Sequence, residues 1–190
     1  MRMSIENITN ILKAKRIGSL ETEIDWILTD SRSLCFAEET LFFALKTKRN
    51  DGHKYIPELY ERGVRNFVVS DLPEELENYA DANFLQVAHP LKALQRLAEK
   101  YRARFDIPVV GITGSVGKTS TKEMIASVLS QKYNVLKTAG NFNNEIGLPL
   151  TIFNIREEHE VAILEMGISD FGEMHRLAKM ARPDICVITN

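Results

Sequence analysis

Short apolar runs alternate with helix-spaced apolar positions through the second half of the chain. The runs are rich in branched residues without a polar alternate, and they occupy residues 107–113, 134–138, 160–167 and 184–189. The helical patterns between and before them cover residues 89–105, 119–133 and 170–181. Strands of this composition are buried on both faces, as in a parallel sheet covered by helices. The alternation therefore predicts βαβ units and an open, doubly wound α/β sheet.

The first half follows a less regular pattern. Strand-like runs occupy residues 26–32, 40–46 and 64–70, and helical patterns occupy residues 4–15 and 53–63. An acidic, turn-forming stretch at 71–83 and a short apolar run at 84–88 follow them. We place a domain boundary at this point. The prediction is a small mixed α/β N-terminal domain over residues 1–86, followed by part of a doubly wound parallel-sheet domain over residues 87–190.

Composition and charge exclude several classes of protein. Hydrophobic residues make up 44% and charged residues 26% of the chain, which is typical of a soluble globular protein. The net charge of −2 leaves no basic arm for nucleic acid, and no apolar run is long enough to cross a membrane. The N-terminus lacks the apolar segment of a secretory signal, and Cys35 and Cys186 lie far apart without CxxC spacing. We expect a cytoplasmic protein with no nucleic-acid partner and no membrane insertion.

The segment VVGITGSVGKTSTKE joins a buried strand to a helix through a glycine-rich turn. Such a turn directs backbone N–H groups at phosphates, and Gly114 and Gly117 would permit a close backbone approach. Lys118 would then reach the β- and γ-phosphates, and the Thr119 hydroxyl would bind magnesium. The strict phosphate-loop spacing requires glycine where this chain has Ile112. The alternative is an ordinary strand-to-helix turn, but the surrounding strand, helix and TGS sequence favour nucleotide binding.

A carboxylate ends one of the predicted strands. Glu165 closes the apolar run VAILE, and ligand sites in open α/β sheets lie at the carboxyl ends of the strands. Beside a phosphate loop, this carboxylate could hold Mg²⁺ directly or through water. The alternative is a solvated acid at the end of a strand. Asn190 ends DICVITN in the same way, and one amide alone carries little weight.

Other polar positions give weaker signals. The four histidines have neither i, i+4 spacing nor a nearby cysteine, which disfavours a metal cluster. The loop TAGNFNNEIGLP is long enough to be functional, although its asparagines also suit turn chemistry. The DSR sequence at 30–32 could bind an anion or close a hairpin, and DG at 51–52 suits a tight turn. The apolar positions of the helix after the glycine turn are predicted to pack in the core: Met124, Ile125, Val128 and Leu129.

Together, these motifs resemble the Mur ligase family, the ATP-dependent amide ligases of peptidoglycan synthesis. TGSVGKTS is similar to the family's variant phosphate loop, TGxxGKT, in which Ile112 is no departure. TAGNFNNEIGLP, LEMG and ITN follow in the family's order, and TDSR, LFFAL and DGHKYI resemble its uridine-nucleotide-binding first domain. GITGS, KTSTKEM and NFNNEIGLP are closer to the members that add D-alanyl-D-alanine than to those that add the third residue. Residues 26–70 also resemble ligases that are fused to an alanine racemase.

The resemblance implies a set of site residues. The positions around the ATP phosphates and adenine are Gly114, Ser115, Gly117, Lys118, Thr119, Ser120 and Asn190. Lys118 and Glu165 are the implied catalytic residues, and Thr119 and Glu165 are the implied metal ligands. The implied substrate-binding positions are Ser31, Arg32, Asp51, Gly52 and His53 near the uridine nucleotide, and Asn141, Asn143 and Asn144 in the loop that faces the substrate and the γ-phosphate.

The resemblance also implies a reaction that uses ATP and Mg²⁺. The γ-phosphate passes to the terminal carboxylate of UDP-N-acetylmuramoyl-tripeptide, and the amine of D-alanyl-D-alanine then attacks the acyl phosphate and releases phosphate. Because carboxylate and triphosphate repel each other, Lys118 and Mg²⁺ would neutralise the charge on the transferring group.

One departure from the family is found at the C-terminal end of the sequence, Asn190. In the family, later segments supply a histidine metal ligand, a modified lysine and a third domain that helps to bind nucleotide and the incoming amine. We therefore expect this chain to be part of a ligase and to have no ligase activity alone. An unfinished sheet would also leave an open strand edge, through which the chain could self-associate.

Three other functions fit parts of the sequence. The first is another enzyme of the superfamily, either a ligase that adds diaminopimelate or lysine or a folylpolyglutamate synthase, although the folate enzymes lack a first domain like residues 26–53. The second is a non-catalytic module that binds a UDP-sugar-peptide and keeps a vestigial nucleotide site. A generic P-loop kinase or GTPase fits least, because the strict spacing is absent.

Overall fold

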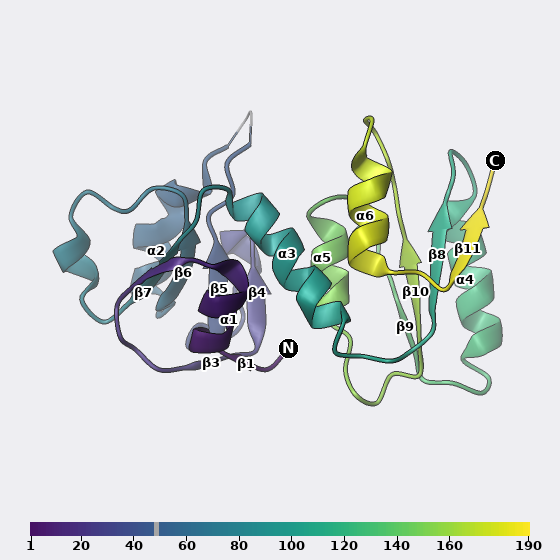
Figure 1. The fold of residues 1–190 in the computed structure, drawn as a ribbon, viewed down its shortest axis with the longest axis horizontal. Coiled ribbons are helices and arrows are strands. Elements are labelled where there is room, and N and C mark those ends of the chain that lie inside the picture. Colours follow the sequence, from purple (N-terminus) through teal and green to yellow (C-terminus); the bar gives the residue numbers. More distant parts are fainter. Residues whose placement is uncertain (48–49) are drawn as a thin grey trace. The chain divides into compact units, whose positions relative to one another are not determined.

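The computed structural model describes residues 1–47 and 50–190, which form two compact units, Met1–Leu97 and Ala98–Asn190 (Figure 1). Helix α3 (Pro90–Arg102) runs across this division. The boundary that we placed between residues 86 and 87 lies just before this helix and stays a prediction. Within the described residues, no helix is long and apolar enough to cross a bilayer.

The first unit is built around a five-stranded sheet. Its strands, in spatial order, are β2 (Lys15–Ile17), β7 (Asn83–Gln86), β6 (Asn66–Val69), β5 (Thr40–Phe43) and β4 (Trp26–Leu28). Neighbouring strands from β4 to β7 run parallel, and β2 runs antiparallel to β7. A separate antiparallel pair consists of β1 (Met3–Ser4) and β3 (Glu23–Ile24). Because β4 and β5 are parallel, the DSR and DGH sequences that follow them leave the sheet at the same edge.

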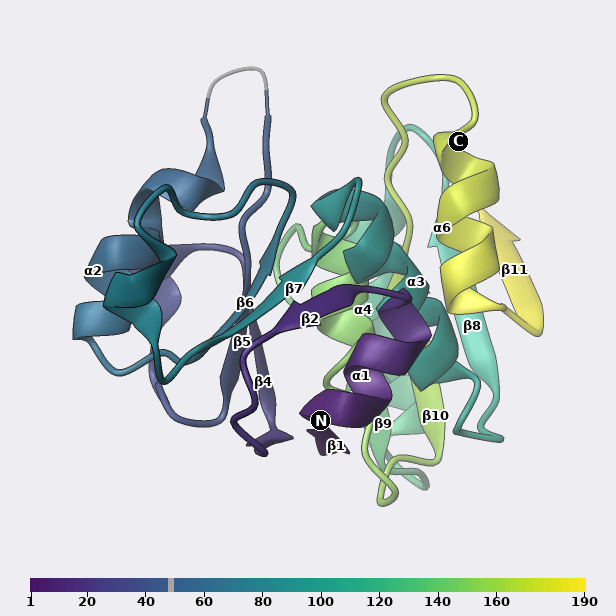
Figure 2. The same ribbon diagram turned by 60° about the vertical axis from the view of Figure 1, so that its left-hand side comes forward.

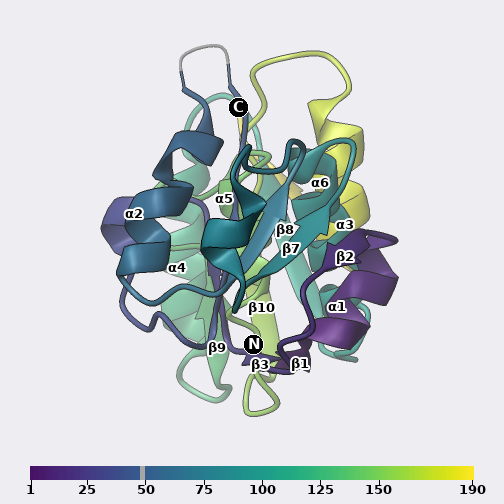
Figure 3. The same ribbon diagram turned by 90° about the vertical axis from the view of Figure 1, so that its left-hand side faces the viewer.

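Helices α1 (Ile5–Leu12) and α2 (Ile56–Glu61) lie on opposite sides of this sheet (Figure 3). The core on the α2 side is aromatic. Phe67 stacks on Phe84 with ring centroids 5.3 Å apart, and its ring meets that of Phe42 edge-on at 6.4 Å. Short 3₁₀ turns occupy Ser31–Ser33, Gly52–Tyr55 and Leu76–Tyr79.

The second unit contains a four-stranded, all-parallel sheet. Its strands, in spatial order, are β11 (Ile185–Ile188), β8 (Val109–Thr113), β10 (Val161–Glu165) and β9 (Val135–Lys137). Helix α4 (Lys118–Leu129) packs on one face, where Ala126 joins a buried cluster with Ile112 and Ile163. Helices α5 (Gly147–Ile152) and α6 (Glu173–Ala181) cover the other face (Figures 1 and 2). Helices on both faces of a parallel sheet confirm the predicted doubly wound architecture.

Strand β11 lies at one edge of this sheet. Ile185 and Ile188 on this strand are 56% and 79% exposed. An edge strand with exposed apolar side chains is a common site of strand pairing between chains. The self-association that we expected through an open edge stays a prediction.

Some elements of the fold differ from those that the sequence pattern predicts. The pattern does not predict β2 or α5, which are three and six residues long, and α5 begins inside the segment that we took as a loop. The expectation that Met124 and Val128 are core residues is wrong, because both side chains are 71% exposed. Ile125 and Leu129 pack against the sheet as expected. Met124 and Val128 lie about 100° further round the helix than these two residues, on the side that the sheet does not cover.

Candidate functional site

The glycine turn at residues 114–117 joins the carboxyl end of β8 to the N-terminus of α4. Gly117 begins the helix with a left-handed φ of 86°. The Lys118 ammonium folds back over the turn and donates to the carbonyl of Gly114 at 2.7 Å, while Ser115 and Ser120 are exposed. The free N–H groups of a helix N-terminus and the lysine above them make this turn a site for an anion.

The end of β11 braces the same turn. The N–H groups of Ser115 and Val116 donate to the carbonyl of Asn190 at 2.8 and 2.6 Å. A Cβ atom at Gly114 would lie 2.4 Å from the carbonyl oxygen of Thr189, and the φ of Gly114 is +132°. Glycine at this position is therefore required by the approach of the protein's own backbone, in addition to any approach of a ligand.

Glu165 is the centre of the polar contacts beside the turn. Its side chain is 2% exposed at the end of β10. The carboxylate accepts from the Thr119 hydroxyl at 3.1 Å and from Nδ2 of Asn143 at 2.8 Å. The ammonium of Lys122 lies 3.6 Å from Oε2. Three segments that are distant in the sequence therefore meet at one carboxylate.

Lys122 is a site residue that the sequence pattern did not single out. The side chain lies on α4 and is 1% exposed. A signal was available, because Lys122 follows Thr119 by three residues and so shares its face of the helix. A lysine on the face that packs against a buried strand needs a partner at the strand end.

The three asparagines of the loop that follows β9 have different contacts. Asn143 contacts Glu165, and its carbonyl accepts the N–H of Gly167 at 2.8 Å. The side chain of Asn144 accepts the N–H groups of Ile146 and Gly147, which is turn chemistry at the start of α5. Asn141 is exposed. Of the three, Asn143 is the one whose side chain meets Glu165.

The donor set at Glu165 suits a hard cation. A carboxylate and a hydroxyl from Thr119 supply oxygen atoms, which Mg²⁺ prefers. In the described part of the chain, no cluster of three or more His, Cys, Asp or Glu side chains could hold a metal ion. In proteins, Mg²⁺ is commonly bound through one or two carboxylates and completes its coordination with phosphates and water.

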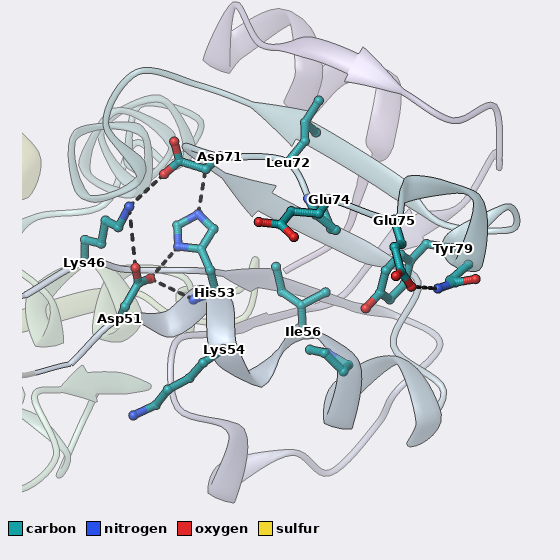
Figure 4. Close-up of a pocket in the computed structure, with 13 residues that line it drawn as sticks. Lys46, Asp51, His53, Lys54, Ile56, Asp71, Leu72, Glu74, Glu75 and Tyr79 are labelled. Atoms are coloured by element: carbon teal, nitrogen blue, oxygen red, sulfur yellow. Dashed lines mark hydrogen bonds and ion pairs between the residues drawn. The ribbon is translucent and has the colours of Figure 1, made fainter.

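The first unit contains a cavity of about 440 Å³ at the carboxyl ends of β5 and β6 (Figure 4). Apolar side chains, among them Ile56 and Leu72, form part of its lining, together with charged groups of both signs. Asp51 and His53 are among the lining residues. Ser31 is buried at the end of β4, and the Arg32 side chain, which pairs with Asp30, is 87% exposed. Neither Ser31 nor Arg32 lines this cavity as far as the described residues show.

A charged network fixes one wall of the cavity. Asp51 Oδ1 lies 2.6 Å from Nδ1 of His53, and Nε2 of His53 accepts the backbone N–H of Ser70 at 3.0 Å. The ammonium of Lys46 lies 2.7 Å from Asp71 and 3.4 Å from Asp51. The hydrogen bond from Lys46, followed by that from the Ser70 hydroxyl, lowers the pKa of Asp71. Burial raises the pKa of Asp51, but hydrogen bonds from His53, together with the charges of His53 and Lys46, leave this pKa lowered.

A strand that ends in a glycine turn, a helix N-terminus beside it and a carboxylate at the next strand end define a P-loop-type nucleotide-binding domain. Residues 112–190 match the Mur ligase middle domain. Residues 23–102 match the Mur ligase family, catalytic domain. The chain belongs to the Mur ligase family.

Curated relatives include two that cover nearly the whole chain. The UDP-N-acetylmuramoyl-tripeptide–D-alanyl-D-alanine ligase of Bacillus subtilis is 41% identical over an alignment that covers 100% of this chain and 41% of the relative. The enzyme of the same name from Escherichia coli is 34% identical over 99% of this chain and 40% of the relative. The chain therefore spans about two fifths of the length of these relatives.

Solved structures agree with this family. MurF from Acinetobacter baumannii superposes with a TM-score of 0.91 at 31% identity, over 99% of this chain and 41% of that protein. The MurF ligase from Thermotoga maritima in complex with ADP gives a TM-score of 0.74 at 35% identity, over 85% of this chain and 36% of that protein.

Substitution of Gly114 tests the bracing of the turn by β11. We expect Gly114→Ala to destabilise the protein by about 3 kcal/mol, because it adds a clash with Thr189 to the strain of a positive φ. Gly140→Ala is the matched control, since Gly140 also has a positive φ but its Cβ would meet nothing within 4 Å. The control should cost about 1 kcal/mol in chemical denaturation followed by circular dichroism. Equal losses for the two variants would contradict the bracing.

The ion pair of Lys46 can be tested through its effect on Asp71. Lys46→Met should raise the pKa of the Asp71 carboxyl, measured by carbon-13 NMR titration, because the largest cause of its depression is removed. A carboxyl with a lowered pKa stabilises the fold above its unfolded pKa and loses that contribution as pH falls through the folded value. The stability difference between wild type and variant should therefore shrink in acid. The pKa of Asp81, which Tyr60 and Arg65 lower, should not change.

Proposed function

We propose that this chain forms the nucleotide-binding part and the first-substrate-binding part of an ATP-dependent amide ligase of peptidoglycan synthesis. The enzyme would add D-alanyl-D-alanine to UDP-N-acetylmuramoyl-tripeptide in the cytoplasm. The observation that carries the proposal is the meeting of Thr119, Asn143 and Glu165 beside the glycine turn. The names of relatives at 41% and 34% identity support this activity, which we propose for a protein of the length of those relatives.

The glycine turn would hold the triphosphate of ATP. The N–H groups at the start of α4 and the helix dipole favour an anion at this position. Lys118 now donates to the carbonyls of Gly114 and Ser115, at 2.7 and 3.4 Å, and it would exchange these bonds for phosphate oxygens. Ser115, Gly117 and Ser120 would contribute to phosphate binding, and Asn190 would approach the adenine.

The proposed reaction has two steps. An oxygen of the tripeptide's terminal carboxylate bonds to the γ-phosphorus as the bond from that phosphorus to the bridging oxygen of ADP breaks. The neutral amine of D-alanyl-D-alanine then bonds to the acyl carbon as the bond from that carbon to the phosphate oxygen breaks. Inorganic phosphate leaves with the electron pair, and the nitrogen gives up one proton to solvent. Lys118 would lower the repulsion between carboxylate and triphosphate in the first step, because its charge lies over the turn.

Thr119 and Glu165 are the residues that we propose as ligands of Mg²⁺. When bound, Mg²⁺ would supply positive charge beside the phosphates. Glu165 also orients Asn143, whose loop would face the substrate together with Asn141 and Asn144. Glu165 would thus link the metal ligand on α4 to the loop that receives the carboxylate substrate.

The uridine nucleotide would bind at the carboxyl edge of the sheet in the first unit. We propose Ser31 and Arg32 after β4, and Asp51, Gly52 and His53 after β5, as residues of this region. Arg32 offers an exposed guanidinium, which suits the diphosphate.

Nucleotide binding is tested by removing the lysine of the turn. Lys118→Ala should weaken the binding of ADP with Mg²⁺ by about tenfold or more in calorimetric titration, because a charge-assisted hydrogen bond is lost. Lys132→Ala, at an exposed position beyond α4, should bind as wild type does. A folded wild-type chain without affinity for ADP or ATP would favour the non-catalytic module instead.

Substrate binding is tested by titrating the chain with UDP-N-acetylmuramoyl-tripeptide and with free UDP. We expect tighter binding of the tripeptide compound, because it offers contacts beyond the uridine diphosphate. Arg32→Ala should weaken both, whereas Arg2→Ala, at another exposed arginine, should weaken neither. Failure of a folded sample to bind either compound would contradict the assignment of nucleotide recognition to residues 1–86.

A further inference from the structure

Lys122 is a buried charged group that the proposed reaction does not use. Its side chain is 1% exposed and projects from α4 toward the end of β10. Lysine is almost never fully buried unless it is paired. The contacts of its ammonium group therefore indicate what the lysine does.

Three oxygen atoms surround this ammonium. It donates to the carbonyl of Thr138 at 2.8 Å, and it lies 3.6 Å from Oε2 of Glu165. The third is Oε1 of Glu123 at 3.4 Å. Glu123 is about half exposed and also pairs with Lys137, whereas Glu165 is 2% exposed. The buried carboxylate is thus the partner whose charge water screens least.

Thr138 holds Lys122 and Glu165 next to each other through its hydroxyl and its carbonyl. Thr138 is fully buried, and its hydroxyl accepts the N–H of Glu165 at 2.9 Å. The carbonyl of the same threonine accepts from Lys122. Lys122 and Glu165 therefore share Thr138 as a hydrogen-bond partner. If the ammonium moved away from the carboxylate, it would lose its hydrogen bond to the Thr138 carbonyl.

The lysine also compensates the charge that would attract a cation. Thr119 and Asn143, the other side chains that contact the Glu165 carboxylate, are neutral. With Lys122 in place, the buried pair has no net charge, so the protein alone offers little attraction for a divalent cation. The phosphates of a nucleotide would add the missing negative charge and oxygen ligands.

We propose that Lys122 is a positioning residue: it is the protein's own counter-charge for Glu165, and it makes Mg²⁺ binding at this carboxylate depend on the nucleotide. The inference rests on the proposed function, because it takes Glu165 as a metal ligand. Without Lys122, the uncompensated carboxylate would bind Mg²⁺ in the absence of nucleotide.

Thermal unfolding of the whole chain with MgCl₂, against NaCl of equal ionic strength, tests the proposal. The Tm of wild type should not respond to Mg²⁺ alone and should rise with Mg²⁺ and ADP together. The Tm of Lys122→Met should rise by about 3 °C or more with Mg²⁺ alone. Lys132→Met should respond as wild type does, and Lys122→Arg, which keeps the charge, should restore the wild-type response.

Equal responses of wild type and Lys122→Met to Mg²⁺ alone would overturn the proposal. If the wild-type Tm does not rise with Mg²⁺ and ADP together, the nucleotide-binding function is contradicted. This result comes from a separate arm of the experiment. If Lys122→Met does not fold, the same measurements are made on the double variant Lys122→Met, Glu165→Gln. Recovery of folding in the double variant, with no response to Mg²⁺, would support the charge pairing. Failure of both variants to fold would show that Lys122 serves Thr138 alone and would overturn the proposal.

Discussion

The burial of one carboxylate is the constraint on which the site of the second unit depends. Glu165 ends a strand whose residues are all buried, so its charge is withdrawn from water at a cost that only partners can offset. Thr119 from the first turn of α4, Asn143 from the loop after β9 and Lys122 from the body of α4 supply those partners. Satisfying the carboxylate thereby brings the helix and the loop to the same strand end.

The residues at the end of β11 hold the glycine turn in place. The carbonyl of Asn190 accepts two consecutive N–H groups of the turn, and Thr189 lies where a side chain on Gly114 would project. The turn is therefore held by the two residues that follow β11. A lysine folded over it and a helix N-terminus beside it give the sheet edge the positive charge that a triphosphate requires.

In the first unit, most of the charged groups are exposed to solvent. Its charged groups line an open cavity, where solvent screens them, and Lys46 is shared between Asp51 and Asp71. His53 has the Asp51 carboxylate at one ring nitrogen and a backbone N–H at the other. This network ties the segment after β5 to the end of β6 and fixes one wall of the cavity. In both units, charged groups therefore order the polar side chains at the carboxyl ends of parallel strands, with exposed charge in the first unit and buried charge in the second.

The pattern of residues along the chain predicts the doubly wound sheet, the glycine turn with Lys118, and the carboxylate at the end of β10. Each of these depends on local spacing, and continuous apolar runs and glycine positions are visible in one dimension. The pattern does not predict that Asn143 and Lys122 converge on Glu165, or that Met124 and Val128 face outward, and both are seen in the folded protein. The sequence pattern also does not predict short elements such as α5. These outcomes depend on which surfaces meet across the sheet, and contacts between distant segments leave no period in the sequence.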